Sequence, residues 1–267
     1  MTAIPKVLSI AGTDPSGGAG IQADLKAFSA LGGYGMVVIT GLVAQTTTGV
    51  REILEVPAAF VESQLDTLLT DVPADAVKIG MLGEAAVVRV VAAALDRFSP
   101  PYVVLDPVMV AKSGDRLLAQ DAVAALREEL LPRVDLITPN LPEAADLLDE
   151  PQATGVEEMR EQVKRLHALG ARRVLLKGGH LDGDVCVDVF SEGDGAIELS
   201  APRVATRNTH GTGCTLSAAI AALRPRHADW LAAVREAKEY LTGALRAADT
   251  LDVGHGRGPV HHFHAIW

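Results

Sequence analysis

The sequence predicts an α/β fold with a mostly parallel central sheet that is flanked by helices on both faces. Apolar runs typical of strands alternate with helix-like segments along almost the whole chain. These runs are apolar at nearly every position, so neither face of the sheet can lie in water. No linker-like stretch, low-complexity segment or internal repeat divides the 267 residues. We therefore predict one domain over residues 1–267.

The first half of the chain contains three strand–helix units. A short apolar run that ends at a glycine is typical of a buried strand, and apolar positions at helical spacing are typical of a helix. A loop rich in turn residues, 13–20, separates the first strand from its helix. The predicted strands are 6–12, a run that starts near 37, 76–82 and 102–105, and the predicted helices are 21–31, 57–69 and 84–98.

The second half continues the alternation. Leu141 and Glu143 open a helix directly after an apolar strand, and Pro225 stops a helix that is apolar on nearly every side. The predicted strands are 136–138, 172–176, 185–190 and 196–199, and the predicted helices are 118–130, the segment from 141, 156–169, the segment from 214 and 229–249.

Composition excludes several classes of protein. The formal net charge of −10 argues against binding to nucleic acid or to a membrane surface. No apolar run reaches the length of a membrane span, and the first strand begins too close to Met1 to leave room for a signal peptide. Cys186 and Cys214 give no disulfide framework, which fits a reducing compartment. We expect a soluble cytoplasmic protein.

The glycine-rich segment 208–214 stands directly before the apolar helix. Gly211 and Gly213 let the backbone approach a ligand closely, and a buried helix start presents free N–H groups and a positive dipole end. An anion such as a phosphate is the expected partner. Cys214 falls on the first turn, where the same field favours thiolate over thiol. The alternative is a glycine-rich turn before a core helix, with an inert buried cysteine.

Two common nucleotide motifs are absent. Gly18, Gly20 and Ala23 match the spacing of the dinucleotide fingerprint, but the region 37–49 lacks the acidic residue that this site requires. A Walker A sequence is also missing. We therefore expect neither a Rossmann cofactor site nor a P-loop.

Polar residues follow the predicted strands where the strands end. In open α/β sheets the ligand lies beyond these carboxyl ends. Asp106 and Glu143 offer the oxygen ligands that Mg²⁺ prefers, and Lys177 could neutralise a phosphate in transfer. Together with the loop at Gly211 these residues predict phosphoryl transfer from a nucleotide. The alternatives are a turn cap for Asp106, a helix-start charge for Glu143 and a solvated strand end for Lys177.

The acceptor pocket is expected near the N-terminal loop and the second strand. Asp24, Gln45 and Met81 lie on segments that we expect to end at the same edge of the sheet. The Gln45 amide can both donate and accept, which suits the edge of an aminopyrimidine. A satisfied buried amide is the alternative for this side chain.

Seven segments together resemble one known family. They are 11–26, 42–46, 78–81, 105–109, 138–143, 177–180 and 208–214. In these segments the chain is similar to the hydroxymethylpyrimidine/phosphomethylpyrimidine kinases of thiamine biosynthesis, which belong to the ribokinase-like superfamily. The match covers almost the whole chain, including the tail 255–263. The resemblance implies two ATP-dependent phosphorylations, first of the pyrimidine's hydroxymethyl group and then of the monophosphate.

The resemblance also implies roles for individual residues. The groups expected to act in catalysis are Gly211, Gly213, Cys214 and Lys177; those near the pyrimidine are Gln45, Asp24, Met81 and Val108; those near the nucleotide are Lys177, Asn140, Thr209, Gly211 and Thr212; and those for Mg²⁺ are Asp106 and Glu143. The superfamily usually carries Asp where Cys214 stands. Because an ordinary thiol is mostly protonated at neutral pH, the identity of the general base stays open. A homodimer is the default expectation from the family.

Three other interpretations compete with this one. A pyridoxal or pyridoxine kinase would perform the same chemistry on another heteroaromatic alcohol. A catalytically silent nucleotide-binding regulator is disfavoured because no acidic, lysine or glycine position of the set is lost. His255, His261, His262 and His264 could form a metal site, but the residues between them are more typical of a terminus that packs onto the body.

Overall fold

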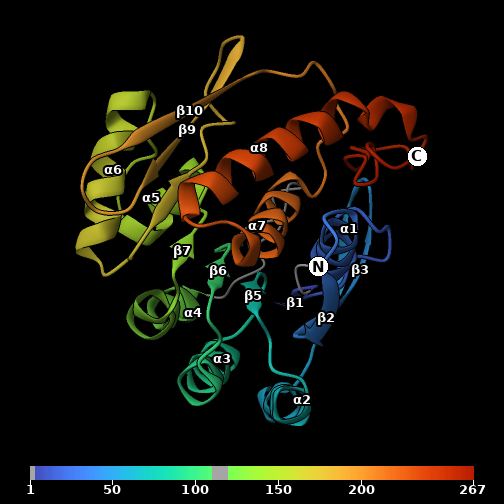
Figure 1. The fold of residues 1–267 in the computed structure, drawn as a ribbon, viewed down its shortest axis with the longest axis vertical. Coiled ribbons are helices and arrows are strands. Elements are labelled where there is room, and N and C mark those ends of the chain that lie inside the picture. Colours follow the sequence, from blue (N-terminus) through green and yellow to red (C-terminus); the bar gives the residue numbers. More distant parts are fainter. Residues whose placement is uncertain (1–3, 110–119) are drawn as a thin grey trace.

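The fold is an eight-stranded sheet covered by helices on both faces (Figure 1), in a computed structural model that describes residues 4–109 and 120–267. The strand order is β10-β9-β8-β7-β6-β5-β1-β2. Strands β2, β1, β5, β6, β7 and β8 run parallel, and β9 and β10 are antiparallel to their neighbours. The predicted α/β class is therefore confirmed. The sheet strands are β1 (Lys6–Ala11), β2 (Tyr34–Ile39), β5 (Ala76–Ile79), β6 (Val103–Leu105), β7 (Leu136–Ile137), β8 (Val174–Leu176), β9 (Val185–Ser191) and β10 (Ile197–Pro202).

The helices form two layers. One layer contains α1 (Gly20–Ala30), α7 (Thr212–Leu223) and α8 (Trp230–Arg246). The other contains α2 (Ala58–Asp71), α3 (Ala85–Phe98), α4 (Gln120–Ala125), α5 (Leu141–Leu148) and α6 (Val156–Ala168). Figure 1 shows the strands running between these layers, with α7 and α8 on one side and α2 and α3 on the other.

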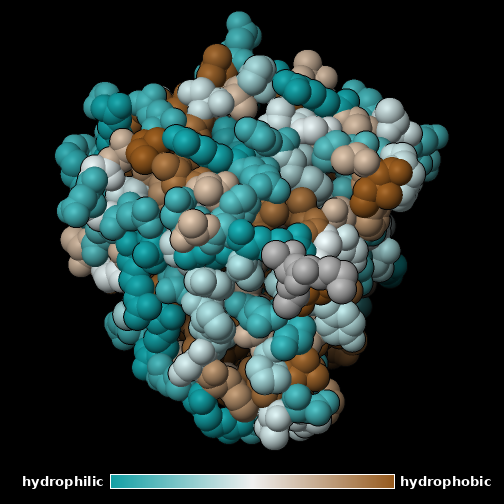
Figure 2. Space-filling model, viewed as in Figure 1, coloured by the Kyte–Doolittle hydropathy of each residue, from teal (hydrophilic) through white to brown (hydrophobic). Residues whose placement is uncertain are grey.

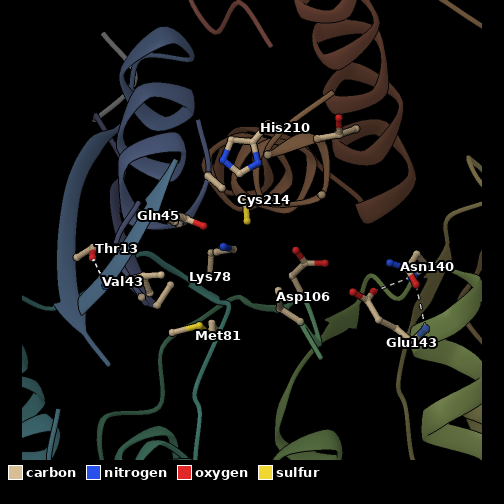
Figure 3. A pocket seen from close by; sticks show the side chains of 18 of the residues that line it. Thr13, Val43, Gln45, Lys78, Met81, Asp106, Asn140, Glu143, His210 and Cys214 are labelled. Carbon is tan, nitrogen blue, oxygen red and sulfur yellow. Dashed lines mark hydrogen bonds between the residues drawn. The ribbon is translucent and has the colours of Figure 1, made fainter. Parts of the chain in front are cut away.

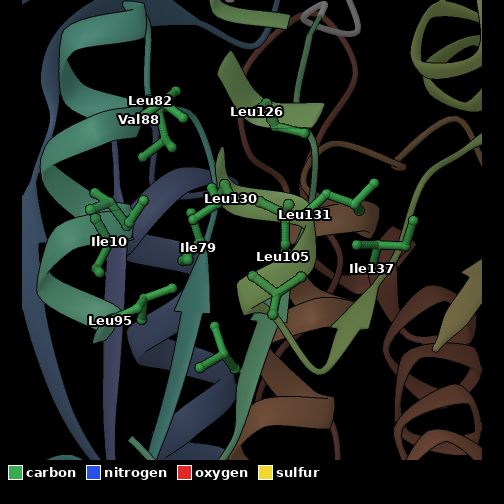
Figure 4. Close-up of a cluster of buried hydrophobic side chains, with 14 of the residues drawn as sticks. Ile10, Ile79, Leu82, Val88, Leu95, Leu105, Leu126, Leu130, Leu131 and Ile137 are labelled. Carbon is green, nitrogen blue, oxygen red and sulfur yellow. The ribbon is translucent and has the colours of Figure 1, made fainter. Parts of the chain in front are cut away.

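Alternating strand residues supply the two cores, because successive side chains of a strand point to opposite faces. Val7, Ala76 and Val104 pack with α1, α7 and α8, whereas their neighbours Leu8 and Val77 belong to the opposite cluster. Figure 4 shows part of that opposite cluster, where Ile10, Ile79, Leu105 and Ile137 of four parallel strands meet leucines of the covering helices. Burial on both faces explains why the strands are apolar throughout.

A separate antiparallel hairpin replaces the single second strand that the apolar run predicted. β2 ends at Ile39, and β3 (Gly41–Thr46) then pairs with β4 (Gly49–Glu55) outside the main sheet. The Thr13 hydroxyl accepts a hydrogen bond from the Val43 N–H at 3.0 Å, so the hairpin is fastened to the loop after β1. This contact brings Gln45 to the edge of the sheet from an element that the sequence did not separate.

The helix predicted over 118–130 is irregular in its described part. α4 is followed by a single π-turn over Leu126–Leu130 and a 3₁₀ turn over Leu131–Arg133, and residues 118 and 119 lie outside the described residues. The helix predicted over 229–249 ends at Arg246 and continues as a 3₁₀ turn over Ala248–Thr250.

The surface is largely hydrophilic on the face shown in Figure 2, with apolar residues in small separate groups. Within the described ranges, no helix is long and apolar enough to cross a membrane.

Candidate active site

A pocket opens beyond the carboxyl ends of the parallel strands, where α7 begins (Figure 3). Side chains that follow β1, β5, β6, β7 and β8 meet there, as expected for an open α/β sheet. Figure 3 places Gln45, Thr13 and Val43 on one side of the pocket, and Asn140 and Glu143 on the other. The lining residues are Ala11, Gly12, Thr13, Ala19, Gly20, Val43, Gln45, Lys78, Met81, Asp106, Val108, Asn140, Glu143, Lys177, His210, Gly211, Thr212, Gly213 and Cys214.

The start of α7 requires glycine at position 211 and leaves little room for a side chain at position 213. Gly211 precedes the helix with a φ of +73°, and a Cβ there would overlap the carbonyl oxygen of Gly18. A Cβ on Gly213 would lie 3.2 Å from Lys177 Nζ and 3.4 Å from Asp106 Oδ2. The glycines thus let a backbone loop and two charged side chains reach the helix start. Every residue from Thr215 to Leu223 is buried, which confirms the predicted buried helix.

Cys214 lines the pocket on the first turn of α7 and is half-buried. Burial raises the pKa of its thiol to about 11, although the Lys78 ammonium acts in the opposite direction. The carboxylates of Asp24 and Asp106 raise it further. The expectation that the helix start favours the thiolate is therefore wrong for this pocket. Desolvation and two carboxylates outweigh the helix field and the nearby cation.

Lys177 joins the two acidic residues that were predicted to meet. Its Nζ donates to Asp106 Oδ1 at 2.8 Å and lies 3.9 Å from Glu143 Oε2. The Thr138 hydroxyl donates to the same Asp106 oxygen at 3.0 Å. Burial opposes the charge of Asp106, but Lys177 and Lys78 hold the pKa of its carboxyl below the usual value. Asp106 is thus a buried carboxylate, only 2 % exposed, held ionised by two lysines.

Glu143 caps the start of α5, which was the alternative prediction for this residue, and it also lines the pocket. It closes a capping box, in which the Glu143 N–H donates to Asn140 Oδ1 at 2.9 Å and the Asn140 N–H donates to Glu143 Oε2 at 2.8 Å. Burial raises the pKa of Glu143 to about 7 in spite of the Lys177 charge. The cap therefore fixes the position of the carboxyl group at the pocket wall.

These two acids fit a magnesium ion that keeps water and phosphate as its other ligands. Among the described residues, the hydrogen bonds to Asp106 all fall on Oδ1, and that to Glu143 falls on Oε2, so one oxygen of each carboxyl stays available. The described residues contain no group of three or more His, Cys, Asp and Glu that could hold a metal ion. A two-carboxylate site is the type that Mg²⁺ uses next to substrate phosphates.

Gln45, Met81 and Val108 line the pocket as expected, but Asp24 and Thr209 do not. Asp24 is fully buried on α1, where its two oxygens accept from Lys78 Nζ at 2.9 and 3.0 Å and from the Ser9 hydroxyl at 2.5 Å. Both oxygens of this buried carboxylate are occupied by these hydrogen bonds, so Asp24 cannot face a substrate. The prediction that Asp24 lies beside Gln45 and Met81 in the acceptor pocket is therefore wrong. The Thr209 carbonyl accepts a hydrogen bond from the hydroxyl of the lining residue Thr212 at 2.7 Å.

Two titratable residues that line the pocket received no role from the sequence. Lys78 lies beneath Cys214 with its ammonium paired to Asp24, and Asp24 raises the pKa of that ammonium although burial alone would lower it. A lysine inside an otherwise apolar strand is a signal that could have found it. His210 Nε2 bonds Asp14 Oδ2 at 2.7 Å across 196 residues of sequence. No local pattern signals that contact.

Asp14 is a rigid acceptor for His210. Its carboxylate also accepts from the backbone N–H groups of Ser16, Gly18 and Ala19 at 2.7 to 3.0 Å and from the Ser16 hydroxyl at 2.7 Å. Burial opposes its charge, but these hydrogen bonds and His210 lower the pKa of Asp14 to about 2. An ionised carboxylate fixed in this way holds the proton of the imidazole on Nε2.

Three of the four tail histidines, His261, His262 and His264, pack onto the body of the protein, whereas His255 is exposed. His261 and His262 are buried, and His262 Nε2 lies 3.0 Å from the Thr215 hydroxyl. The ring of His264 contacts Tyr240 at a centroid distance of 5.4 Å. Burial lowers the pKa of His262 to about 3, and the Lys26 charge lowers it further. This histidine is therefore a neutral core residue.

Comparison with known proteins gives a consistent result. A family model described as phosphomethylpyrimidine kinase matches residues 14–261. The hydroxymethylpyrimidine/phosphomethylpyrimidine kinase of Escherichia coli is 60% identical over 260 residues, which covers 97% of this chain and 98% of that protein. Two solved structures are also similar. The pyridoxal kinase of Bacillus subtilis, solved as an ADP complex, has a TM-score of 0.91 and 36% identity over 98% of this chain and 99% of its own. The phosphomethylpyrimidine kinase of Clostridium difficile has a TM-score of 0.80 and 38% identity over 91% of this chain and 100% of its own.

Proposed function

Since this chain belongs to the phosphomethylpyrimidine kinase family, we propose that it phosphorylates 4-amino-5-hydroxymethyl-2-methylpyrimidine with ATP and then phosphorylates the resulting monophosphate to the diphosphate. In the first step the hydroxyl oxygen forms a bond to the γ-phosphorus as the bond to the β,γ-bridging oxygen breaks. ADP leaves with that electron pair, and the hydroxyl proton is lost to solvent or to a phosphate oxygen.

One observation carries the proposal: a single pocket presents an acceptor side and a donor side at the start of α7. Gln45 and Met81 form the side suited to a flat polar heterocycle, with an amide that can bond a ring edge. Asn140 lies on the other side, and a β-bridge between Asn140 and Lys177 holds the lysine next to it, so both suit the nucleotide phosphates. A group at the helix start would therefore touch both reactants, as in-line transfer requires.

The helix start supplies the site for the phosphoryl group in transfer. We assign this role to the backbone N–H groups near Gly211, Thr212 and Gly213, where the helix dipole favours negative charge. Lys177 would neutralise charge that develops on the transferred group, and Thr209 would shape the loop through its bond to Thr212.

Cys214 is proposed to orient the attacking hydroxyl rather than to act as a strong base. A thiol with a pKa of about 11 keeps its proton at neutral pH. Phosphoryl transfer passes through a loose transition state, in which positioning and charge stabilisation matter more than early proton removal. The half-buried thiol stands on the first turn of α7, at the junction of the two sides of the pocket.

Mg²⁺ is proposed to bind at Asp106 and Glu143. When bound, it would neutralise charge on the nucleotide phosphates. Glu143→Gln keeps the size of the side chain and its cap to the Asn140 N–H but removes the charge. The variant should require a several-fold higher Mg²⁺ concentration for half-maximal rate. A Mg²⁺ dependence equal to that of the wild type would leave Glu143 as a helix cap only.

The similarity to a pyridoxal kinase supports a second candidate function, the phosphorylation of pyridoxal or pyridoxine. An ATP-coupled assay with hydroxymethylpyrimidine, its monophosphate, pyridoxine and pyridoxal separates the two. We expect the highest kcat/KM for the pyrimidines. Turnover of the vitamin B6 alcohols alone would contradict the proposed function.

We also propose that the chain is one domain and acts as a cytoplasmic homodimer. Its two cores share one sheet. Its two cysteines are both free, which suits a reducing compartment. Tyr34 on the edge strand and Leu42 and Leu54 on the hairpin are exposed apolar residues that a second copy could cover. Light scattering after gel filtration would give the mass directly, and a monomer at micromolar concentration would contradict the dimer.

A further inference from the structure

The two proposed acceptors differ greatly in charge. The first is a neutral alcohol, whereas the second is a phosphate monoester that carries about −1.5 to −2 charges at pH 7. The pocket wall already contains the ionised carboxylate of Asp106 and the carboxyl group of Glu143. The second acceptor therefore needs a positive group on its own side of the pocket.

Among the described lining residues, three side chains can carry a positive charge: Lys78, Lys177 and His210. The Lys78 ammonium is bonded to both oxygens of Asp24, so this pair is neutral as a whole. Lys177 is bonded to Asp106 and bridges to Asn140 on the side proposed for the nucleotide. Neither lysine is available to the acceptor.

His210 is the remaining group, and it is held ready on the acceptor side. Its Nε2 bonds Asp14 Oδ2 at 2.7 Å, and the Asp14 carboxylate is itself fixed by the loop after β1. Within the described part of the chain, Nδ1 of His210 makes no hydrogen bond. Figure 3 shows the imidazole beside the start of α7, toward Gln45 and away from Asn140.

We propose that His210, oriented by Asp14, binds the phosphate group of the second acceptor through Nδ1 as an imidazolium and so enables the second phosphorylation. This inference rests on the proposed function. In that step an oxygen of the monoester forms the bond to the γ-phosphorus, the bond to the β,γ-bridging oxygen breaks, and ADP leaves. The attacking oxygen is already ionised, so no proton has to be removed. The second step thus depends on a positive charge that the neutral first acceptor does not require.

The test compares the two acceptors in the same variants. His210→Gln can still donate to Asp14 but carries no charge, whereas His210→Arg keeps a positive charge. The measured quantity is the kcat/KM for the monophosphate divided by the kcat/KM for hydroxymethylpyrimidine, which cancels general damage to the fold or to the ATP site. We expect the ratio to fall on the order of ten- to a hundredfold in His210→Gln, which corresponds to the loss of a charged hydrogen bond. In His210→Arg it should stay closer to the wild-type ratio.

An unchanged ratio in His210→Gln, or equal falls in both variants, would overturn the inference, because charge would then not be the cause. A wild-type enzyme that phosphorylates neither pyrimidine would instead overturn the proposed function.

A second measurement uses the wild-type protein alone. Diethylpyrocarbonate modification of His210, located by mass spectrometry, should be slowed more by the monophosphate than by hydroxymethylpyrimidine. Equal protection by the two would also overturn the inference.

Discussion

Replacing Lys78 by Met should destabilise the protein strongly, because it leaves the Asp24 carboxylate buried without its counter-charge. Both side chains are fully buried, and the Nζ–Oδ2 distance is 2.9 Å. At an effective dielectric constant of about 20, two unit charges at that distance attract by about 6 kcal/mol. Desolvation opposes part of this, and removal of one partner from a buried pair typically costs about 3–5 kcal/mol. We therefore expect the free energy of unfolding to fall by about 3–5 kcal/mol.

The assay is equilibrium unfolding in guanidinium chloride, followed by circular dichroism. The matched control is Lys164→Met, which breaks the exposed pair with Glu161 and should cost less than about 1 kcal/mol. Asp24→Asn and the double variant Lys78→Met/Asp24→Asn complete a cycle. The double variant should lose less stability than the sum of the single variants, because it leaves no unpaired charge in the core.

Two outcomes would refute this reasoning. If Lys78→Met cost no more than the exposed control, the pair would not be a buried ion pair in solution. If the single effects simply added in the double variant, Lys78 and Asp24 would not interact.

Three further predictions concern other residues. The pKa of His262 lies at about 3 in the folded chain against an ordinary value of 6.5, so the unfolded chain takes up the proton first as the pH falls. The free energy of unfolding should keep its full value above pH 6.5 and be lower by about 2 kcal/mol at pH 5. In His262→Gln the free energy of unfolding should change less between these pH values. Gln45→Ala should lower kcat/KM for hydroxymethylpyrimidine by roughly tenfold or more with little change in the KM for ATP; an unchanged kcat/KM would remove Gln45 from the acceptor site. In a Cys186→Ala background, alkylation of Cys214 by iodoacetamide should be slower than that of free cysteine at pH 7.5 and still rise above pH 9.5, whereas a plateau near pH 8.5 would contradict the raised pKa.

The sequence predicted most of the fold because burial on both faces leaves a clear apolar pattern in strands such as β1 and β5. It also predicted that Asp106, Glu143 and Lys177 would meet, since the carboxyl ends of parallel strands share one edge. The hairpin β3–β4 was missed because its apolar run continues directly from β2. A change of register between Ala44 and Gln45, which re-aims the side chain, has no local signature either.

The chemistry of individual side chains was harder to predict than their location. Asp24 lies on the core side of α1, but a sequence does not state which lysine will meet it 54 residues later. The pKa of the Cys214 thiol likewise depends on residues that are distant in the sequence. The helix start argued for a lowered pKa, whereas the sum of burial and carboxylates, which depends on distant segments, raises it. Local fields can be read from a sequence, but desolvation requires the packed structure.

The bond between Asp14 and His210 has a consequence for folding kinetics. It joins residues that are 196 positions apart in the sequence. Two further contacts beside it also join distant parts of the chain: the close approach of Gly18 to Gly211 and the β-bridge between His210 and Pro259. Contacts of such long range carry a large loop-closure entropy and form after the local strand–helix units. The pocket should therefore be among the last regions to assemble, so interactions made there slow unfolding more than they speed folding. A bound nucleotide would then lower mainly the unfolding rate and so prolong the lifetime of the folded chain.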